Sequence, residues 1–278
     1  MEPVPQRAGS GGGAPSAPAF APDPAHGRMF TTAQVVRGTD VTPSGRLRFD
    51  ALARYLQDAA EDDLADAGWD EPYGWLLRRC EVTVRGYPGR GERVGVRTFC
   101  SGTGPRWAER TTTLSGPSGD LMQAVAVWVA VTREDGRPCP LGAAFHRLYG
   151  PSAGERQVSA RLSLPGPPAR DGQPWPLRAT DIDMAGHVNN SVHWAAVEDV
   201  LAGLAGAPAA AELEYHRQIL PGQQPLLVTS HNSDHVGAWL LDGAHRLASA
   251  RLTLAASASS PARLSPRARP GDPPRLIP

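Results

Sequence analysis

Two stretches of the chain place apolar residues at helical spacing directly after a polar loop. The first is a helix predicted over residues 48–67, and the second is a helix predicted over residues 191–204. Asn189 or Asn190 is expected to start the second helix, because Asn is a preferred N-cap residue. The apolar residues that mark the two helices are Leu52, Leu56, Ala59 and Leu64 in the first, and Val192, Ala195, Val197, Leu201 and Leu204 in the second.

Strand-like runs follow each helix, and the two series repeat each other. The runs lie at 93–100, 108–114 and 121–132 in the first copy, and at 224–230, 237–241 and 246–255 in the second. The loop RGTDVTPSG recurs as RATDIDMAG at an offset of 178 − 37 = 141, and CEVTVRGYPG resembles LEYHRQILPG at an offset of 221 − 88 = 133. The chain is therefore predicted to be an α+β protein made of two related units, each a long helix wrapped by a curved antiparallel sheet.

Composition sets the predicted boundaries of these units. Residues 1–28 and 258–278 are rich in Pro, Gly, Ala and Ser or Arg, and we expect them to be disordered tails. The two units are expected at 29–150 and 177–257, joined by a Pro- and Gly-rich linker over residues 151–176.

Charge and cysteine content exclude several functions. The net charge is zero, which argues against a nucleic-acid binder, and no apolar run is long enough for a membrane span. The three cysteines, Cys80, Cys100 and Cys139, have no paired spacing, so neither a disulfide framework nor a metal site is predicted. We expect no cofactor and a reduced, cytoplasmic setting.

The second loop carries chemistry that the first lacks. Asp183, His187, Asn189 and Asn190 have as counterparts Thr42, Arg46, Arg48 and Phe49. The shared residues, Arg37 and Arg178, Asp40 and Asp181, and Gly45 and Gly186, are interpreted as structural. A carboxylate and an imidazole beside a helix N-terminus, with its free N–H groups, suit acyl transfer, although Asp and Asn are also ordinary capping residues.

The run DIDMAGHVNN before a helix resembles the active loop of hot-dog thioesterases, and the tandem arrangement is similar to the acyl-[acyl carrier protein] thioesterases. The resemblance covers roughly residues 30–256 and implies a double hot-dog fold. In that family the loop is D-x-N-x-H-V-N-N, and a Glu on a following strand completes the site. The resemblance thus implies Asp183, His187 and Glu214, while Ala185 replaces the family Asn and Ile219 replaces a Cys found in plant members. Strand alternation leaves open whether Glu214 faces the helix.

This resemblance implies release of a fatty or related acid from an acyl carrier protein. Asp183 would act as base or nucleophile, His187 would orient the substrate or protonate the leaving thiolate, Asn190 would hold the loop, and N–H groups near residues 189–191 would bind the oxyanion. Asn189 would bind the substrate, and the acyl chain would enter a pocket in the first unit, with Leu52, Tyr55, Leu56 and Trp75 as lining candidates.

Two other functions remain open. The chain is also consistent with a thioesterase acting on coenzyme A esters, or, given Ala185, with an acyl-binding protein that does not catalyse. Docking of an acidic carrier protein would require a local basic patch, for which Arg78 and Arg79 are candidates. The oligomeric state is left open, because the tandem repeat already provides an internal pseudo-dimer.

Overall fold

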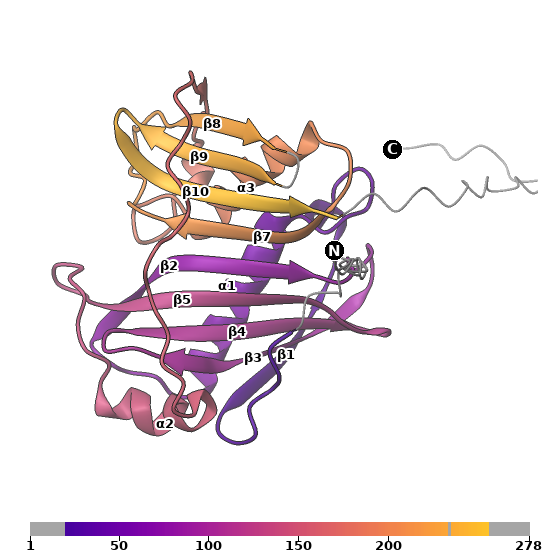
Figure 1. Cartoon of the computed structure of the whole chain (residues 1–278). Coiled ribbons are helices and arrows are strands. Elements are labelled where there is room, and N and C mark those ends of the chain that lie inside the picture. The colour runs from indigo at the N-terminus through magenta and orange to yellow at the C-terminus, as the bar shows by residue number, and fades with distance from the viewer. Residues whose placement is uncertain (1–19, 233–234, 256–278) are drawn as a thin grey trace, which may run out of the picture.

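The computed structural model describes residues 20–232 and 235–255, and within them the chain forms one ten-stranded antiparallel sheet (Figure 1). The strand order is β1-β3-β4-β5-β2-β7-β10-β9-β8-β6. The first half contains β1 (Met29–Val35), β2 (Tyr73–Val84), β3 (Arg93–Thr103), β4 (Trp107–Gly116) and β5 (Gly119–Thr132). The second half contains β6 (Gln173–Pro174), β7 (Pro208–Tyr215), β8 (Leu226–His231), β9 (Val236–Asp242) and β10 (His245–Leu254).

The two halves join through β2 and β7, and the register of this pair reflects the sequence repeat. Arg79 lies opposite Glu214, and Glu81 lies opposite Glu212. The sequence offset of 133 relates Arg79 to Glu212 and Glu81 to Glu214, so the repeat exchanges the two pairs. Between them, Cys80 lies opposite Leu213, its own counterpart at this offset. The joint is therefore an approximate two-fold axis, which confirms the predicted tandem α+β fold.

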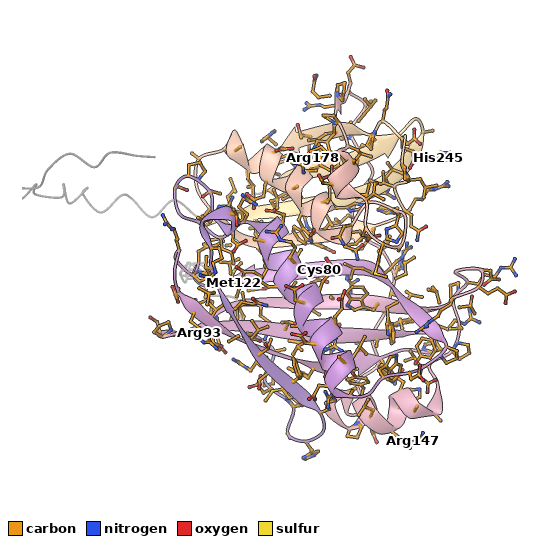
Figure 2. All side chains as sticks on the ribbon, turned by 180° about the vertical axis from the view of Figure 1, so that it is seen from behind. Cys80, Arg93, Met122, Arg147, Arg178 and His245 are labelled. Atoms are coloured by element: carbon orange, nitrogen blue, oxygen red, sulfur yellow. The ribbon has the colours of Figure 1, made fainter. Side chains whose placement is uncertain are left out.

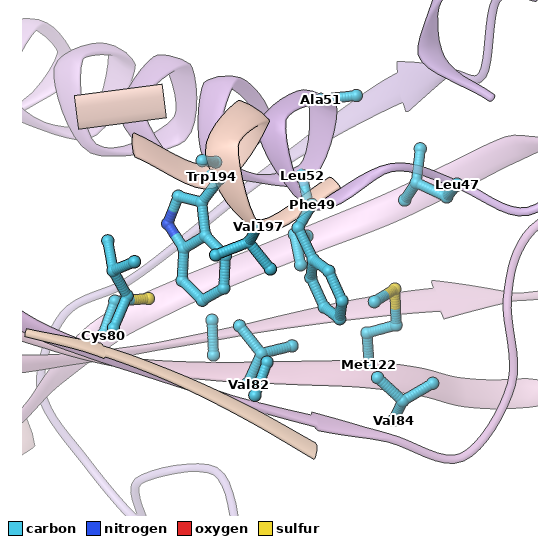
Figure 3. Close-up of a cluster of buried hydrophobic side chains, with 14 of the residues drawn as sticks. Leu47, Phe49, Ala51, Leu52, Cys80, Val82, Val84, Met122, Trp194 and Val197 are labelled. Carbon is cyan, nitrogen blue, oxygen red and sulfur yellow. The ribbon is translucent and has the colours of Figure 1, made fainter. Parts of the chain in front are cut away.

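Two helices cover one face of the sheet. The long helix α1 (Phe49–Asp66) crosses the first half, as seen from behind in Figure 2, and α3 (Asn190–Ala202) covers the second half. They meet over β2, where the rings of Phe49 and Trp194 lie 5.4 Å apart above Val82 (Figure 3). Burial of these large side chains holds both helices against the sheet and so fixes the loops that precede them.

The predicted helices are confirmed, but a third helix was not anticipated. Helix α2 (Ala143–Ala153) packs Phe145 and Tyr149 against β3, although Pro151 and Gly150 lie near its end. Helix breakers in this position led to the prediction of a linker from residue 151. The structure places residues 151–153 in the helix, because burial of its aromatic face outweighs their low helix propensity.

The predicted tail boundary at residue 28 is also too late in the chain. Ala21 exchanges hydrogen bonds with the side chain of Gln123 at 2.7 and 3.0 Å, and Asp23 pairs with Arg97. Arg28 reaches the buried Asp63 on α1 at 2.6 Å. Residues 20–28 therefore belong to the folded unit, whereas the rest of both predicted tails, 1–19 and 258–278, lies outside the described residues.

The linker crosses the face of the sheet opposite α1 and α3 (Figure 1), and it is held there by hydrogen bonds. Trp107 on β4 donates its indole N–H to Val158 O at 2.9 Å. Trp239 on β9 donates in the same way to Pro165 O at 2.9 Å. The two anchors lie on different halves, so the linker ties them together on the outer face.

Within the described ranges, no helix is long and apolar enough to cross a membrane. The same residues contain no group of three or more His, Cys, Asp or Glu side chains that could hold a metal ion.

Candidate active site

The two polar loops have the same backbone conformation. Each begins with a short 3-10 helix, η1 (Gly38–Asp40) or η2 (Ala179–Asp181), and each closes through one isolated bridge. Gly45 and Gly186 have φ values of +87° and +78°, a left-handed conformation that glycine adopts without strain. The repeat in sequence is thus a repeat in structure, and the shared glycines have the turn-forming role that was predicted.

The shared aspartates are also structural. Asp40 and Asp181 are buried, and each accepts the backbone N–H three residues earlier, from Arg37 or Arg178, at 2.8 Å. Asp181 additionally pairs with the Arg178 guanidinium at 2.9 Å. These contacts brace the loop from inside, so neither carboxylate is available for chemistry.

Asp183 and His187 face each other across the second loop. His187 Nδ1 lies 3.7 Å from Asp183 Oδ2 and 3.2 Å from Val188 O. Asn189 donates its side-chain N–H to Asp183 Oδ2 at 3.3 Å, and Ala185 donates its backbone N–H to Asp183 Oδ1 at 2.9 Å. Both side chains are about a fifth exposed, so this carboxylate–imidazole pair is fixed in position and still open to a substrate.

The N-terminus of α3 completes this arrangement. Asn189 is the N-cap: its side-chain oxygen accepts the N–H of Ser191 at 2.9 Å, and its backbone oxygen accepts that of Val192 at 3.0 Å. The N–H of Asn190 has no acceptor in the described part of the chain. One donor at the positive end of the helix is therefore left for an incoming oxygen atom.

A cavity of about 360 Å³ leads from this loop into the first half. Its mouth is formed by the loop residues Asp183, Met184, Ala185, His187, Asn189 and Asn190. Its far wall is formed by α1, α2 and the first-half strands, through the polar residues Gln57, Glu61, Glu109 and Arg110 and through Ala60, Leu64, Trp75, Cys100, Ala108, Trp128, Phe145 and Tyr149. The wall is mainly aromatic and aliphatic, as expected of a pocket for an apolar group.

Several predicted pocket residues lie elsewhere. Asn189 and Trp75 line the cavity, but Leu52, Tyr55 and Leu56 do not. Leu52 is buried in the central core, Leu56 packs against that core, and Tyr55 donates its hydroxyl to Asp40 at 2.7 Å. The most apolar stripe of α1 faces the sheet, so the less apolar stripe of Gln57, Ala60, Glu61 and Leu64 is left for the cavity.

Glu214, which the family resemblance placed in the site, is not brought to the loop. Its neighbour Tyr215 points toward α3, where the hydroxyl donates to Asn190 O at 3.2 Å. Strand alternation then directs Glu214 to the outer face, where Oε1 accepts the N–H groups of Ser163 at 2.5 Å and Leu164 at 3.0 Å. Glu214 is fully buried and anchors the linker.

The predicted basic patch at Arg78 and Arg79 is also occupied by structural contacts. Arg78 donates to Tyr215 O at 3.0 Å. Arg79 donates to Arg161 O at 3.0 Å and pairs with Glu81 at 3.0 Å. Charge reversal at either residue would disturb the joint between the halves, so these residues do not test carrier docking.

Burial determines the ionisation of two groups near the cavity. Desolvation raises the pKa of the Cys100 thiol to about 11, so this pocket residue is protonated at neutral pH and is a poor nucleophile. Desolvation lowers the pKa of His193, which lies one turn into α3, to about 4. His193 is therefore neutral and packs edge-on against Tyr215 with ring centroids 5.0 Å apart.

Family comparisons cover most of the chain. Residues 27–149 match the model of the acyl-ACP thioesterase N-terminal domain, and residues 169–246 match that of the C-terminal domain. An uncharacterized protein of Mycobacterium tuberculosis is 30% identical over 218 residues, which is 77% of this chain and 86% of that protein.

Solved structures share the fold at lower identity. The 12:0-ACP thioesterase from Umbellularia californica superimposes with a TM-score of 0.71 at 20% identity, covering 82% of this chain and 97% of that one. An acyl-ACP thioesterase from Bacteroides thetaiotaomicron gives a TM-score of 0.68 at 17% identity, covering 82% and 98%.

Proposed function

The chain belongs to the acyl-ACP thioesterase family and is a thioester hydrolase, and we propose that it hydrolyses the thioester of an acyl-[acyl carrier protein] to release a free carboxylic acid. The observation that carries this proposal is the cavity that runs from Asp183 and His187 into an apolar pocket of the first half. Chemistry is assigned to the second half and acyl binding to the first.

In the proposed reaction the thioester carbonyl lies over the N-terminus of α3. Its oxygen accepts the free N–H of Asn190, which stabilises the negative charge of the tetrahedral intermediate. Asp183 removes a proton from a water molecule, whose oxygen attacks the carbonyl carbon. Collapse of the intermediate breaks the C–S bond and leaves the acid and a carrier thiolate.

His187 is positioned to return the proton. In the tautomer that carries its hydrogen on Nε2, His187 Nδ1 lies 3.7 Å from the Asp183 carboxylate, so a small movement away from Val188 O lets this nitrogen accept the proton taken from water and later give it up again. The imidazole then protonates the leaving thiolate, and the two side chains return to their starting state. Asn189 holds Asp183 in place at 3.3 Å throughout.

This mechanism uses neither the family Asn at position 185 nor Glu214. Ala185 contributes its backbone N–H to Asp183, so it orients the carboxylate without a side chain. The role that the resemblance gives to Glu214 has no support in its position on the outer face. Asp183, His187 and Asn190 are accordingly the proposed catalytic residues.

The test is turnover of a panel of acyl carrier protein thioesters of different chain length, branching and ring content, with released acids identified by mass spectrometry. Matched coenzyme A esters are assayed beside them, and the Asp183→Asn variant serves as a control. We expect hydrolysis by the parent protein, a higher kcat/KM for carrier-bound substrates, and little hydrolysis by the variant. Equal kcat/KM on both thioester types would refute the carrier assignment, and acyl binding without hydrolysis would refute the reaction.

A further inference from the structure

At the first-half loop, a side-chain oxygen of the protein lies where the matching position of the second loop is open to a substrate oxygen. Glu198 on α3 reaches the N-terminus of α1, where its Oε1 accepts the N–H of Phe49 at 2.7 Å. Arg46 clamps the same carboxylate through Nη1 at 3.0 Å and Nη2 at 2.5 Å. A carboxylate oxygen thus occupies the position at α1 that corresponds to the open position at α3.

The approximate two-fold axis identifies the counterpart of each group. At the offset of 141, Phe49 corresponds to Asn190 and Arg46 corresponds to His187. Applied in the other direction, the same offset relates Glu198 on α3 to Gln57 on α1. The counterpart of the side chain that reaches across is therefore Gln57, which lines the same cavity as Asn190 at the N-terminus of α3.

The two positions differ in chemistry in a consistent way. Glu198 is about a tenth exposed and is fully paired, whereas Gln57 lines the active cavity together with His187 and Asn190. Among the described residues the side chain of Gln57 forms no hydrogen bond. A carboxylate at that position would accept the free N–H of Asn190 and repel a developing oxyanion, but a carboxamide can donate to one.

We propose that Gln57 is a catalytic residue, whose side-chain N–H donates to the thioester carbonyl oxygen beside the backbone N–H of Asn190. It would come from the first half and complete an oxyanion hole in the second. The geometry of Glu198 at Phe49 further implies that a product carboxylate binds with one oxygen on the N–H of Asn190. This inference rests on the proposed function for its kinetic part only.

The kinetic test compares Gln57→Ala, Gln57→Glu and the matched variant Glu198→Gln on the best carrier thioester of the panel. Loss of one oxyanion donor typically lowers kcat by roughly 10²–10³, so we expect this from Gln57→Ala with little change in KM. Gln57→Glu should lose at least as much at pH 8. Glu198→Gln should lower the melting temperature, because Arg46 loses its charged partner, yet leave kcat within a factor of about three.

A binding test is independent of turnover. Dodecanoate is titrated into each protein by calorimetry, and we expect Kd to rise roughly tenfold to a hundredfold in Gln57→Ala, the size of one hydrogen bond to a charged group. Parent values of both kcat and dodecanoate affinity in Gln57→Ala would overturn the proposal, as would losses confined to Gln57→Glu. If the parent hydrolyses nothing in the panel, the proposed function fails, while unchanged or weakened dodecanoate binding still decides the role of Gln57.

Discussion

The variant Glu214→Ala distinguishes a structural role of Glu214 from a catalytic one. Its carboxylate is fully buried and accepts two backbone N–H groups of the linker, from Ser163 and Leu164. Truncation leaves the N–H of the buried Leu164 unpaired, whereas the N–H of the exposed Ser163 can turn to water, so the free energy of unfolding should fall by about 1–3 kcal/mol. The substrate cavity does not include this side chain, so kcat of the folded protein should remain within a factor of about three.

The repeat supplies a matched control for this measurement. Glu81 is the counterpart of Glu214 at the offset of 133, and its side chain is 49% exposed and paired with Arg79. Glu81→Ala should change stability by only about 0.5 kcal/mol, the usual size for an exposed pair. Urea unfolding followed by tryptophan fluorescence gives the stabilities, and initial rates below the transition give kcat. A loss of 10² or more in kcat with an unchanged unfolding midpoint would refute the structural assignment.

Asp183→Asn should lower kcat by roughly 10²–10⁴, the range for loss of a general base, while Asp181→Asn should mainly lower the unfolding free energy, by about 1–3 kcal/mol; activity losses in the reverse order would contradict the loop assignment. Ala108→Phe fills the cavity wall and should shift the released acids toward shorter chains, whereas the core variant Leu52→Ala should cost about 2–5 kcal/mol of stability without altering the product profile. Burial lowers the pKa of His193 to about 4, so below pH 6.5 the unfolded chain binds more protons than the folded one, and stability should decline by about 3 kcal/mol as pH falls from 6.5 to 4. His193→Phe should flatten that part of the stability curve, and an unchanged slope would show that other groups cause it.

Much of the architecture follows from local patterns in the sequence. Helix α1 and helix α3 begin at Phe49 and Asn190, residues that the loop repeat already places at equivalent positions. The shared Asp and Gly residues have the bracing and turning roles inferred from comparing the two copies. These features depend on capping, turn geometry and apolar periodicity, which act within a few residues.

Two predictions, that Glu214 joins the site and that the apolar face of α1 lines the pocket, are wrong because tertiary packing decides both placements. Alternation along β7 permitted either face for Glu214, and the choice is made by the contact of Tyr215 with α3. Periodicity marked the apolar stripe of α1 but did not indicate that the cavity borders a second stripe, which begins at Gln57.

The unexpected structure near the tail and linker has a similar origin. Composition around residues 20–28 gave no sign that Arg28 reaches a buried Asp63, because the pair spans 35 positions along the chain. Helix α2 forms and includes Pro151, because Phe145 and Tyr149 pack into an aromatic cluster.

The two halves pair through β2 and β7 but belong to one chain, and this has a consequence for how the protein can diverge. In an assembly of two identical subunits, any replacement is inherited by both loops at once, so a group that closes one site closes the other. Here the loops are encoded separately, and Arg46 with Glu198 seals one helix end while His187 and Gln57 leave the other accessible. Mutations in the sealed loop are constrained by stability, and those in the open loop also by access for the substrate, so the two loops can change at different rates.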